Sequence, residues 1–166
     1  MLSTFYSAFS PVAFTVLGLW LVVVQTRHSD WSGSAEHRRR AYAVSLHFAL
    51  PGLMSLLSLV DPNSKAMWKV SFTVIAVLGI VALIALRTRA SSGVNVGAEI
   101  AHWLAVALYA VIGIVAVRPG LLSDLGIDIA PLRVEAIALS LMLFLGINVA
   151  WLLMFDTPDR PVRGGP

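Results

Sequence analysis

The sequence contains no cysteine and has few charged residues. Without cysteine, the chain can form no disulfide, no thiolate metal site and no cysteine nucleophile. Charged residues make up 13% of the chain, whereas soluble domains carry about 25%. Hydrophobic residues make up 58%, and a core of only 166 residues cannot hide that much apolar surface from water. The composition therefore predicts an integral membrane protein.

The first segment of the chain also lacks the features of a secretory signal peptide. No basic residue precedes Arg27, so there is no positively charged region before the apolar run. The apolar run itself is longer than the core of a signal peptide. We therefore interpret this segment as a first membrane span that is retained.

Long apolar segments recur along the whole chain. A helix needs about 20 apolar residues to cross roughly 30 Å of hydrocarbon. Five segments meet this requirement, at 5–25, 41–60, 70–86, 100–117 and 136–155. The predicted fold class is an all-α integral membrane protein: one membrane domain over 1–166, a compact bundle of five transmembrane helices, with a short tail at 156–166. The alternative is a soluble helical bundle, but no predicted helix has a full polar face.

Basic residues divide unequally between the two sides of the predicted bundle. Eight of the twelve lysines and arginines lie after the first and third spans and in the tail, and four lie on the other side. The positive-inside rule then places the N-terminus outside and the C-terminus in the cytoplasm. The run Arg38-Arg39-Arg40 fits a topology signal and contact with anionic lipid head groups. We therefore expect partners in a membrane, of bacterial plasma-membrane type, and no nucleic acid, despite the net charge of +3.

Polar and small residues recur at helical spacing in four of the five predicted spans. These stripes are Thr4, Ser7, Pro11, Thr15, Gly18, Val22 and Gln25 in the first span, His47, Pro51, Ser55 and Ser58 in the second, Glu99, His102, Val106, Tyr109, Gly113 and Ala116 in the fourth, and Ser140, Phe144, Asn148 and Trp151 in the fifth. Polar groups are costly in lipid, so we expect these four faces to contact protein. The nearly aliphatic third span is expected to be the most lipid-exposed. Helix packing is the favoured role of the stripes, and a hydrated path is the alternative.

Pro51 and Gly52 lie near the middle of the second predicted span. Proline has no N–H, so the carbonyl of His47 loses its helical partner, and the adjacent glycine loosens the same turn. The pair predicts a kink that serves packing or acts as a gate.

His47 and His102 are the residues best suited to chemistry. Both follow the cytoplasmic ends of their spans, and with Gln25, Glu99 and Asn148 they predict a polar cluster in the cytoplasmic half of the membrane. Two imidazoles on neighbouring helices can ligate a b-type haem or contact a quinone. The sequence favours no cofactor and no metal, with haem b or a quinone as the alternative.

Two classes of function remain open on sequence alone, and a third is weaker. The favoured one is a non-enzymatic membrane protein, either a homo-oligomeric pore or channel or a structural subunit of a larger membrane complex. The alternative is a redox or cofactor-binding subunit that uses His47 and His102, and the weaker third is a lipid-modifying enzyme. No charged residue falls near the centre of a predicted span, which argues against a proton-coupled pump and a voltage sensor.

Overall fold

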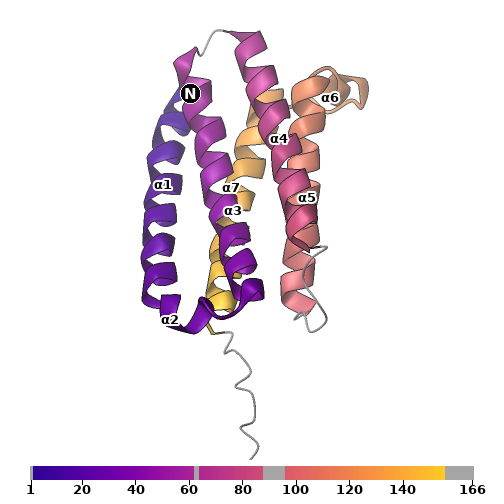
Figure 1. The fold of residues 1–166 in the computed structure, drawn as a ribbon. Helices are drawn as coiled ribbons and strands as arrows, with labels where there is room; N and C mark the ends of the chain where they lie inside the picture. Colours follow the sequence, from indigo (N-terminus) through magenta and orange to yellow (C-terminus); the bar gives the residue numbers. More distant parts are fainter. Residues whose placement is uncertain (1, 62–63, 88–95, 156–166) are drawn as a thin grey trace, which may run out of the picture.

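The computed structural model describes residues 2–61, 64–87 and 96–155, and their regular secondary structure is entirely helical (Figure 1). Five of the helices are long: α1 (Leu2–Thr26), α3 (Ala35–Val60), α4 (Lys65–Arg87), α5 (Val96–Val117) and α7 (Pro131–Met154). Two single-turn helices, α2 (His28–Trp31) and α6 (Leu121–Asp124), lie in the connections. All five long helices are long and apolar enough to cross a membrane. The prediction of an all-helical bundle with five such helices is confirmed, and the predicted tail at 156–166 lies outside the described residues.

Each long helix begins three to six residues before the predicted span. Local signals set these starts. Ser34 caps α3, because its Oγ accepts a hydrogen bond from the backbone N–H of His37 at 3.3 Å. Pro131 occupies the first turn of α7, where its fixed φ and missing N–H suit a helix start.

Four of the long helices form a closed ring, which we call the four-helix unit. Its neighbouring pairs are α3 with α4, α4 with α5, α5 with α7, and α7 with α3. Thus α3 and α5 are diagonally opposite, as are α4 and α7. Helix α1 packs outside this ring, mainly against α3 and also against α7 (Figure 1).

Successive long helices run in alternating directions, so the unit has two distinct ends (Figure 1). We call one the His47 end: it holds the N-terminal ends of α3 and α5 and the C-terminal ends of α4 and α7. We call the other the Glu135 end: α7 begins there, and α6 lies beside it.

Large buried side chains fill the middle of the four-helix unit. Tyr109 of α5 is fully buried, and its hydroxyl donates to the carbonyl of Leu46 on α3 at 3.3 Å, across the diagonal. Further fully buried side chains are Phe48, Met54, Phe72, Ile112, Leu139 and Met142. A path through a single copy would therefore have to displace this core.

Gly79 on α4 makes room for the ring of Tyr109. A Cβ at this position would lie 2.8–2.9 Å from three ring atoms. We expect Gly79→Ala to lower the free energy of unfolding by about 1–3 kcal/mol, because the rigid ring has to move. Thermal unfolding in detergent, followed by circular dichroism, measures this loss. Gly18→Ala is the matched control, because nothing lies within 4 Å of a Cβ there; equal stability of the two variants would contradict the packing described.

The polar stripes divide between the inside and the outside of the bundle. Those of α3 and α5 face the interior, where Ser55 and Tyr109 are fully buried. Those of α1 and α7 face outward, as the exposed Thr15, Ser140 and Asn148 show, so the expectation that all four would contact protein is wrong for these two within one copy. On α1 the opposite face packs instead, because its larger rings and small residues bury more apolar surface: Tyr6, Phe9, Ser10, Ala13 and Trp20.

Helix α4 is not the most outwardly exposed of the five long helices, contrary to expectation. It packs between α3 and α5, and a larger share of α4 than of α1 is buried. The aliphatic sequence misled the prediction because an apolar side chain suits a helix interface and a lipid-facing surface equally well.

Pro51 and Gly52 lie inside α3, which continues without a break through both residues. Both are buried, and a Cβ at Gly52 would lie 3.2 Å from atoms of Ala13 and Phe14 on α1. Ser10 also donates to the Gly52 carbonyl at 3.4 Å. The pair therefore serves close packing of α1 on α3, and its role as a gate stays a prediction.

Candidate functional site

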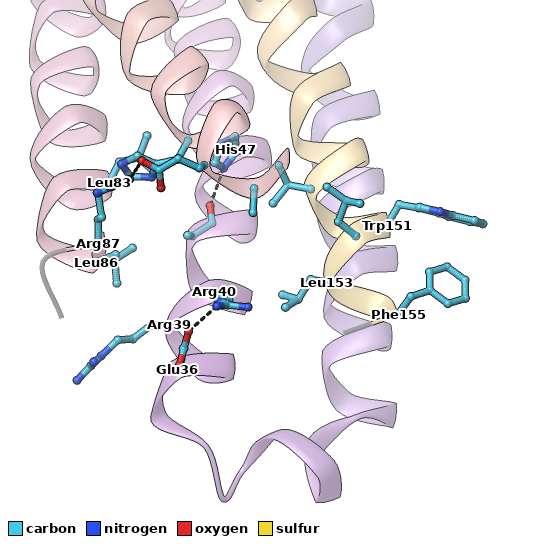
Figure 2. A pocket seen from close by; sticks show the side chains of 16 residues that line it. Glu36, Arg39, Arg40, His47, Leu83, Leu86, Arg87, Trp151, Leu153 and Phe155 are labelled. Carbon is cyan, nitrogen blue, oxygen red and sulfur yellow. Dashed lines mark hydrogen bonds and ion pairs between the residues drawn. The ribbon is translucent and has the colours of Figure 1, made fainter. Parts of the chain in front are cut away.

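A cavity of about 530 Å³ opens at the His47 end of the four-helix unit, and all four helices line it (Figure 2). We call it the basic cavity. Helix α3 contributes its charged N-terminal turns and His47, and α5 contributes Glu99 and His102. Helices α4 and α7 supply mostly apolar side chains, among them Leu83 and Val149. The cavity is therefore amphipathic, with apolar walls and a charged mouth.

His47 is a buried imidazole with a defined tautomer. Its side chain is 3% exposed, and Nδ1 lies 2.7 Å from the carbonyl oxygen of Ala43 (Figure 2). A carbonyl only accepts hydrogen bonds, so Nδ1 carries the proton. In the neutral ring Nε2 then presents a lone pair, and Nε2 is buried without a hydrogen-bond partner among the described residues. This is the arrangement in which a second-shell carbonyl prepares an imidazole as a ligand.

His102 lines the same cavity from α5, the helix diagonally opposite α3. Its Nε2 is likewise buried without a partner among the described residues. It is close enough to His47 for the two rings to interact electrostatically. Two histidines whose Nε2 atoms have no hydrogen-bond partner among the described residues thus line one cavity, from two diagonally opposite helices.

Glu99 ties α4 to the start of α5 beside His102. Its Oε1 accepts from Arg87 Nη1 at 2.5 Å and from Trp103 Nε1 at 2.8 Å. The Arg87 guanidinium also lies over the Trp103 ring, 5.2 Å from its centroid. The three side chains hold the last turn of α4 against the first turns of α5.

The mouth of the cavity has an excess of positive charge. Arg39, Arg40 and Arg87 line it, against the two carboxylates of Glu36 and Glu99. Arg40 forms an ion pair with Glu36, one turn earlier on α3 (Figure 2). Guanidinium groups at such a mouth suit carboxylate or phosphate groups of a ligand.

The predicted polar cluster forms only in part. His47, Glu99 and His102 come together, whereas Gln25 and Asn148 lie on the outer surface and do not line the cavity. Asn148 precedes the lining residue Val149 by one position, so its side chain points about 100° away around α7. Gln25 is remote because α1 packs outside the four-helix unit.

Two of the three arginines in the run Arg38-Arg39-Arg40 line the cavity, and the third does not. Arg39 and Arg40 line the cavity, and Arg38 instead donates to the Ser32 carbonyl in the connection before α3. Contact of the run with lipid head groups stays a prediction.

The sequence alone did not identify Glu36 or Arg87 as residues of this site. The four-residue spacing of Glu36 and Arg40 was a usable signal, because such pairs meet on one helix face.

The chain matches no known protein-family model, no curated protein and no solved structure. Among the described residues, no group of three or more histidine, aspartate and glutamate side chains could hold a metal ion. The site must therefore be interpreted from its own geometry.

Proposed function

We propose that the chain is a cofactor-binding membrane subunit that holds a b-type haem between His47 and His102. The observation that carries the proposal is a pair of imidazoles on diagonally opposite helices, buried His47 and half-buried His102, which line one cavity. In each ring Nε2 is buried and has no hydrogen-bond partner among the described residues. Haem iron takes axial ligands from protein side chains, and histidine is a common one.

The rest of the basic cavity suits the same molecule. A haem is flat and apolar apart from two propionate groups, and the cavity has apolar walls and an arginine-rich mouth. Arg39, Arg40 and Arg87 are placed to receive the propionates, which is a role that guanidinium groups fill well. The Ala43 carbonyl would orient His47, and Glu99 would keep Arg87 in position.

We also place the His47 end at the cytoplasmic face of the membrane. Five arginines in the described residues lie at or near this end: Arg27, Arg38, Arg39, Arg40 and Arg87. The positive-inside rule supports this orientation. The cofactor would then lie in the cytoplasmic half of the bilayer.

The test is a titration of the whole chain in lipid nanodiscs with haem b, in parallel with a quinone. We expect haem to bind at one per chain, with a Soret band that saturates at that ratio. Saturable binding of the quinone alone, or of neither molecule, would overturn the haem assignment. The quinone titration shows whether binding requires ligation of the haem iron or only an apolar cavity that a quinone could also occupy.

A second candidate function is assembly as a homo-oligomer or as a structural subunit, and Asn148 is the observation that favours it. Its side chain is on the outer surface of α7, within a stretch that could span a membrane. One amide N–H donates to the Phe144 carbonyl at 2.7 Å, and the amide oxygen has no partner among the described residues. An amide facing lipid is costly, so contact with another membrane helix would stabilise it.

We expect Asn148→Leu to weaken such an assembly. Interhelical hydrogen bonds in membranes contribute about 0.6–2 kcal/mol, so the dissociation constant should rise by roughly 3- to 30-fold. Native mass spectrometry of the protein in detergent at several concentrations measures the change. Ser140→Ala is the matched control, because the Ser140 hydroxyl is already bonded to the Ala136 carbonyl of its own helix. If Asn148→Leu has the same distribution of oligomeric states as wild type, Asn148 does not support assembly.

A further inference from the structure

The Glu135 end of the four-helix unit contains a carboxyl group that the proposed haem site does not use. Glu135 lies on the inward face of α7, about one turn after the helix begins, and its side chain is 0% exposed. It begins an inward-facing stripe that runs along α7 to the basic cavity, in which Glu135, Leu139, Met142, Gly146 and Leu153 are buried and Val149 is half-buried. An acidic residue thus lies on the buried face of a helix that could span a membrane.

Within the described residues, one of the two carboxyl oxygens of Glu135 has a hydrogen-bond partner. Trp68 Nε1 of α4 donates to Oε2 at 2.5 Å, across the diagonal of the four-helix unit. Oε1 is buried and has no hydrogen-bond partner among the described residues. The pair therefore joins α4 to α7, and it leaves half of the carboxyl group unsatisfied.

Aromatic rings surround this group. Trp68 packs on Phe72 with 6.2 Å between ring centroids, and Tyr6 of α1 packs on the same Phe72 at 6.3 Å. The Tyr6 hydroxyl donates to the Leu132 carbonyl at 3.3 Å, in the turn of α7 that precedes Glu135. The surroundings are therefore largely apolar, with one donor to the carboxyl.

Glu135 has no basic partner in the part of the chain that the structure describes. Within the described residues it has no ion pair with lysine, arginine or histidine, and Trp68 is its only hydrogen-bond donor. Tyr6 is the titratable group that interacts with it electrostatically. Among the described residues, Lys65 and Lys69 of α4 and the exposed Arg133 of α7 form no ion pair with it, and Arg118, after α5, pairs with Asp124 at 3.1 Å.

We propose that Glu135 is a proton-binding site inside the four-helix unit, where proton uptake converts its carboxylate to the neutral acid and proton release reverses the step. A buried carboxylate needs several donors to offset its lost hydration, and Glu135 has one. A metal cation would need several oxygen ligands, and no group of three acidic or histidine side chains gathers there in the described part of the chain. A proton needs neither further ligands nor a cavity.

The position of Glu135 also gives the proton a short route to water. One turn of helix is about 5.4 Å long, and the residues of α7 just before Glu135 are partly exposed. Exchange with the adjoining aqueous face therefore does not require the proton to cross the core around Tyr109. In the ionised form Oε1 carries charge that no donor among the described residues stabilises, so the neutral acid is the form that suits these apolar surroundings.

The test uses infrared difference spectroscopy of the whole chain in nanodiscs, which resolves the C=O stretch of a protonated carboxyl. We expect a protonated carboxyl to persist between about pH 6 and about pH 8, where exposed carboxyls are ionised, and to be lost by about pH 10. The band should disappear in Glu135→Gln, an isosteric variant that keeps an acceptor for Trp68. Trp68→Phe should keep the band and raise its frequency, because the hydrogen bond to the carboxyl is removed.

Glu99→Gln is the matched control. Glu99 also accepts from an indole, that of Trp103 at 2.8 Å, but it is partly exposed and paired with Arg87. This variant should leave the band unchanged. The proposal is overturned if wild type has no protonated carboxyl above about pH 6, if the band survives in Glu135→Gln, or if it persists unchanged beyond about pH 10, since the proton would then never be released. Should Glu135→Gln fail to fold, the frequency shift in Trp68→Phe still assigns the band.

Discussion

Replacing Gly146 with leucine is expected to separate α7 from α3 and to destabilise the bundle by roughly 3 kcal/mol or more. Even a Cβ at Gly146 would lie 2.7 Å from Phe48 Cε1 and 2.8 Å from His47 Cβ. Both neighbours are buried in α3, so neither can move aside without shifting the helix. The lost stability is measured by thermal unfolding in detergent, followed by circular dichroism.

Gly18→Leu provides the control for this prediction. A Cβ at Gly18 has no atom within 4 Å, so the same added volume should leave stability nearly unchanged. A Gly146→Leu protein as stable as Gly18→Leu would mean that α3 and α7 are not packed as described. The basic cavity would then need a different geometry, because His47 is placed by this contact.

The second large effect is expected from His47→Ala. In the proposed haem site, loss of one of two axial ligands should convert six-coordinate, low-spin haem to a five-coordinate form and weaken binding by at least about 10-fold. We expect the same loss of low-spin haem and the same weaker binding in His102→Ala, which removes the other proposed ligand. Absorption spectra and haem titrations of the two variants in nanodiscs measure both changes.

Two controls make this result specific. His28→Ala removes an exposed histidine that does not line the cavity, and it should bind haem like wild type. Added imidazole should restore the low-spin spectrum of His47→Ala, because a free ligand can occupy the space that the side chain leaves. If both cavity variants keep the low-spin spectrum of wild type, the two histidines are not the ligands.

The number and approximate limits of the long helices could be predicted from the sequence because each requires a long apolar run. Their starts were placed too late, since charged residues such as Glu36 and Lys65 were assigned to loops although α3 and α4 already include them. A local signal was present at Ser34 and Pro131, where capping and proline chemistry favour helix initiation.

Of the four predicted stripes, those of α3 and α5 face the interior as expected, and those of α1 and α7 do not. On α3 and α5 the stripes contain His47 and Tyr109, which turn inward. On α1 the stripe contains small hydroxyls such as Thr15, which donates to its own backbone at the Pro11 carbonyl and can therefore face outward. Helix spacing identifies a shared face, but it does not say what that face contacts.

The residues of the candidate site were predicted only in part, and its chemistry stays a prediction. His47, Glu99 and His102 line one cavity, whereas Gln25 and Asn148 do not. The role of Arg87 could not be derived, since it depends on the packing of α4 against α5. Glu135 was missed because the fifth span was started one residue after it, so its burial beside Trp68 depended on tertiary contacts that the sequence does not specify.

The measurement that tests the haem proposal most directly is an absorption spectrum and a native mass, taken on one sample of the chain purified in nanodiscs. The account predicts a low-spin haem spectrum and a mass increase of one haem per chain, either as purified or after haem is added. A chain that remains colourless and keeps its unmodified mass in the presence of haem would contradict it.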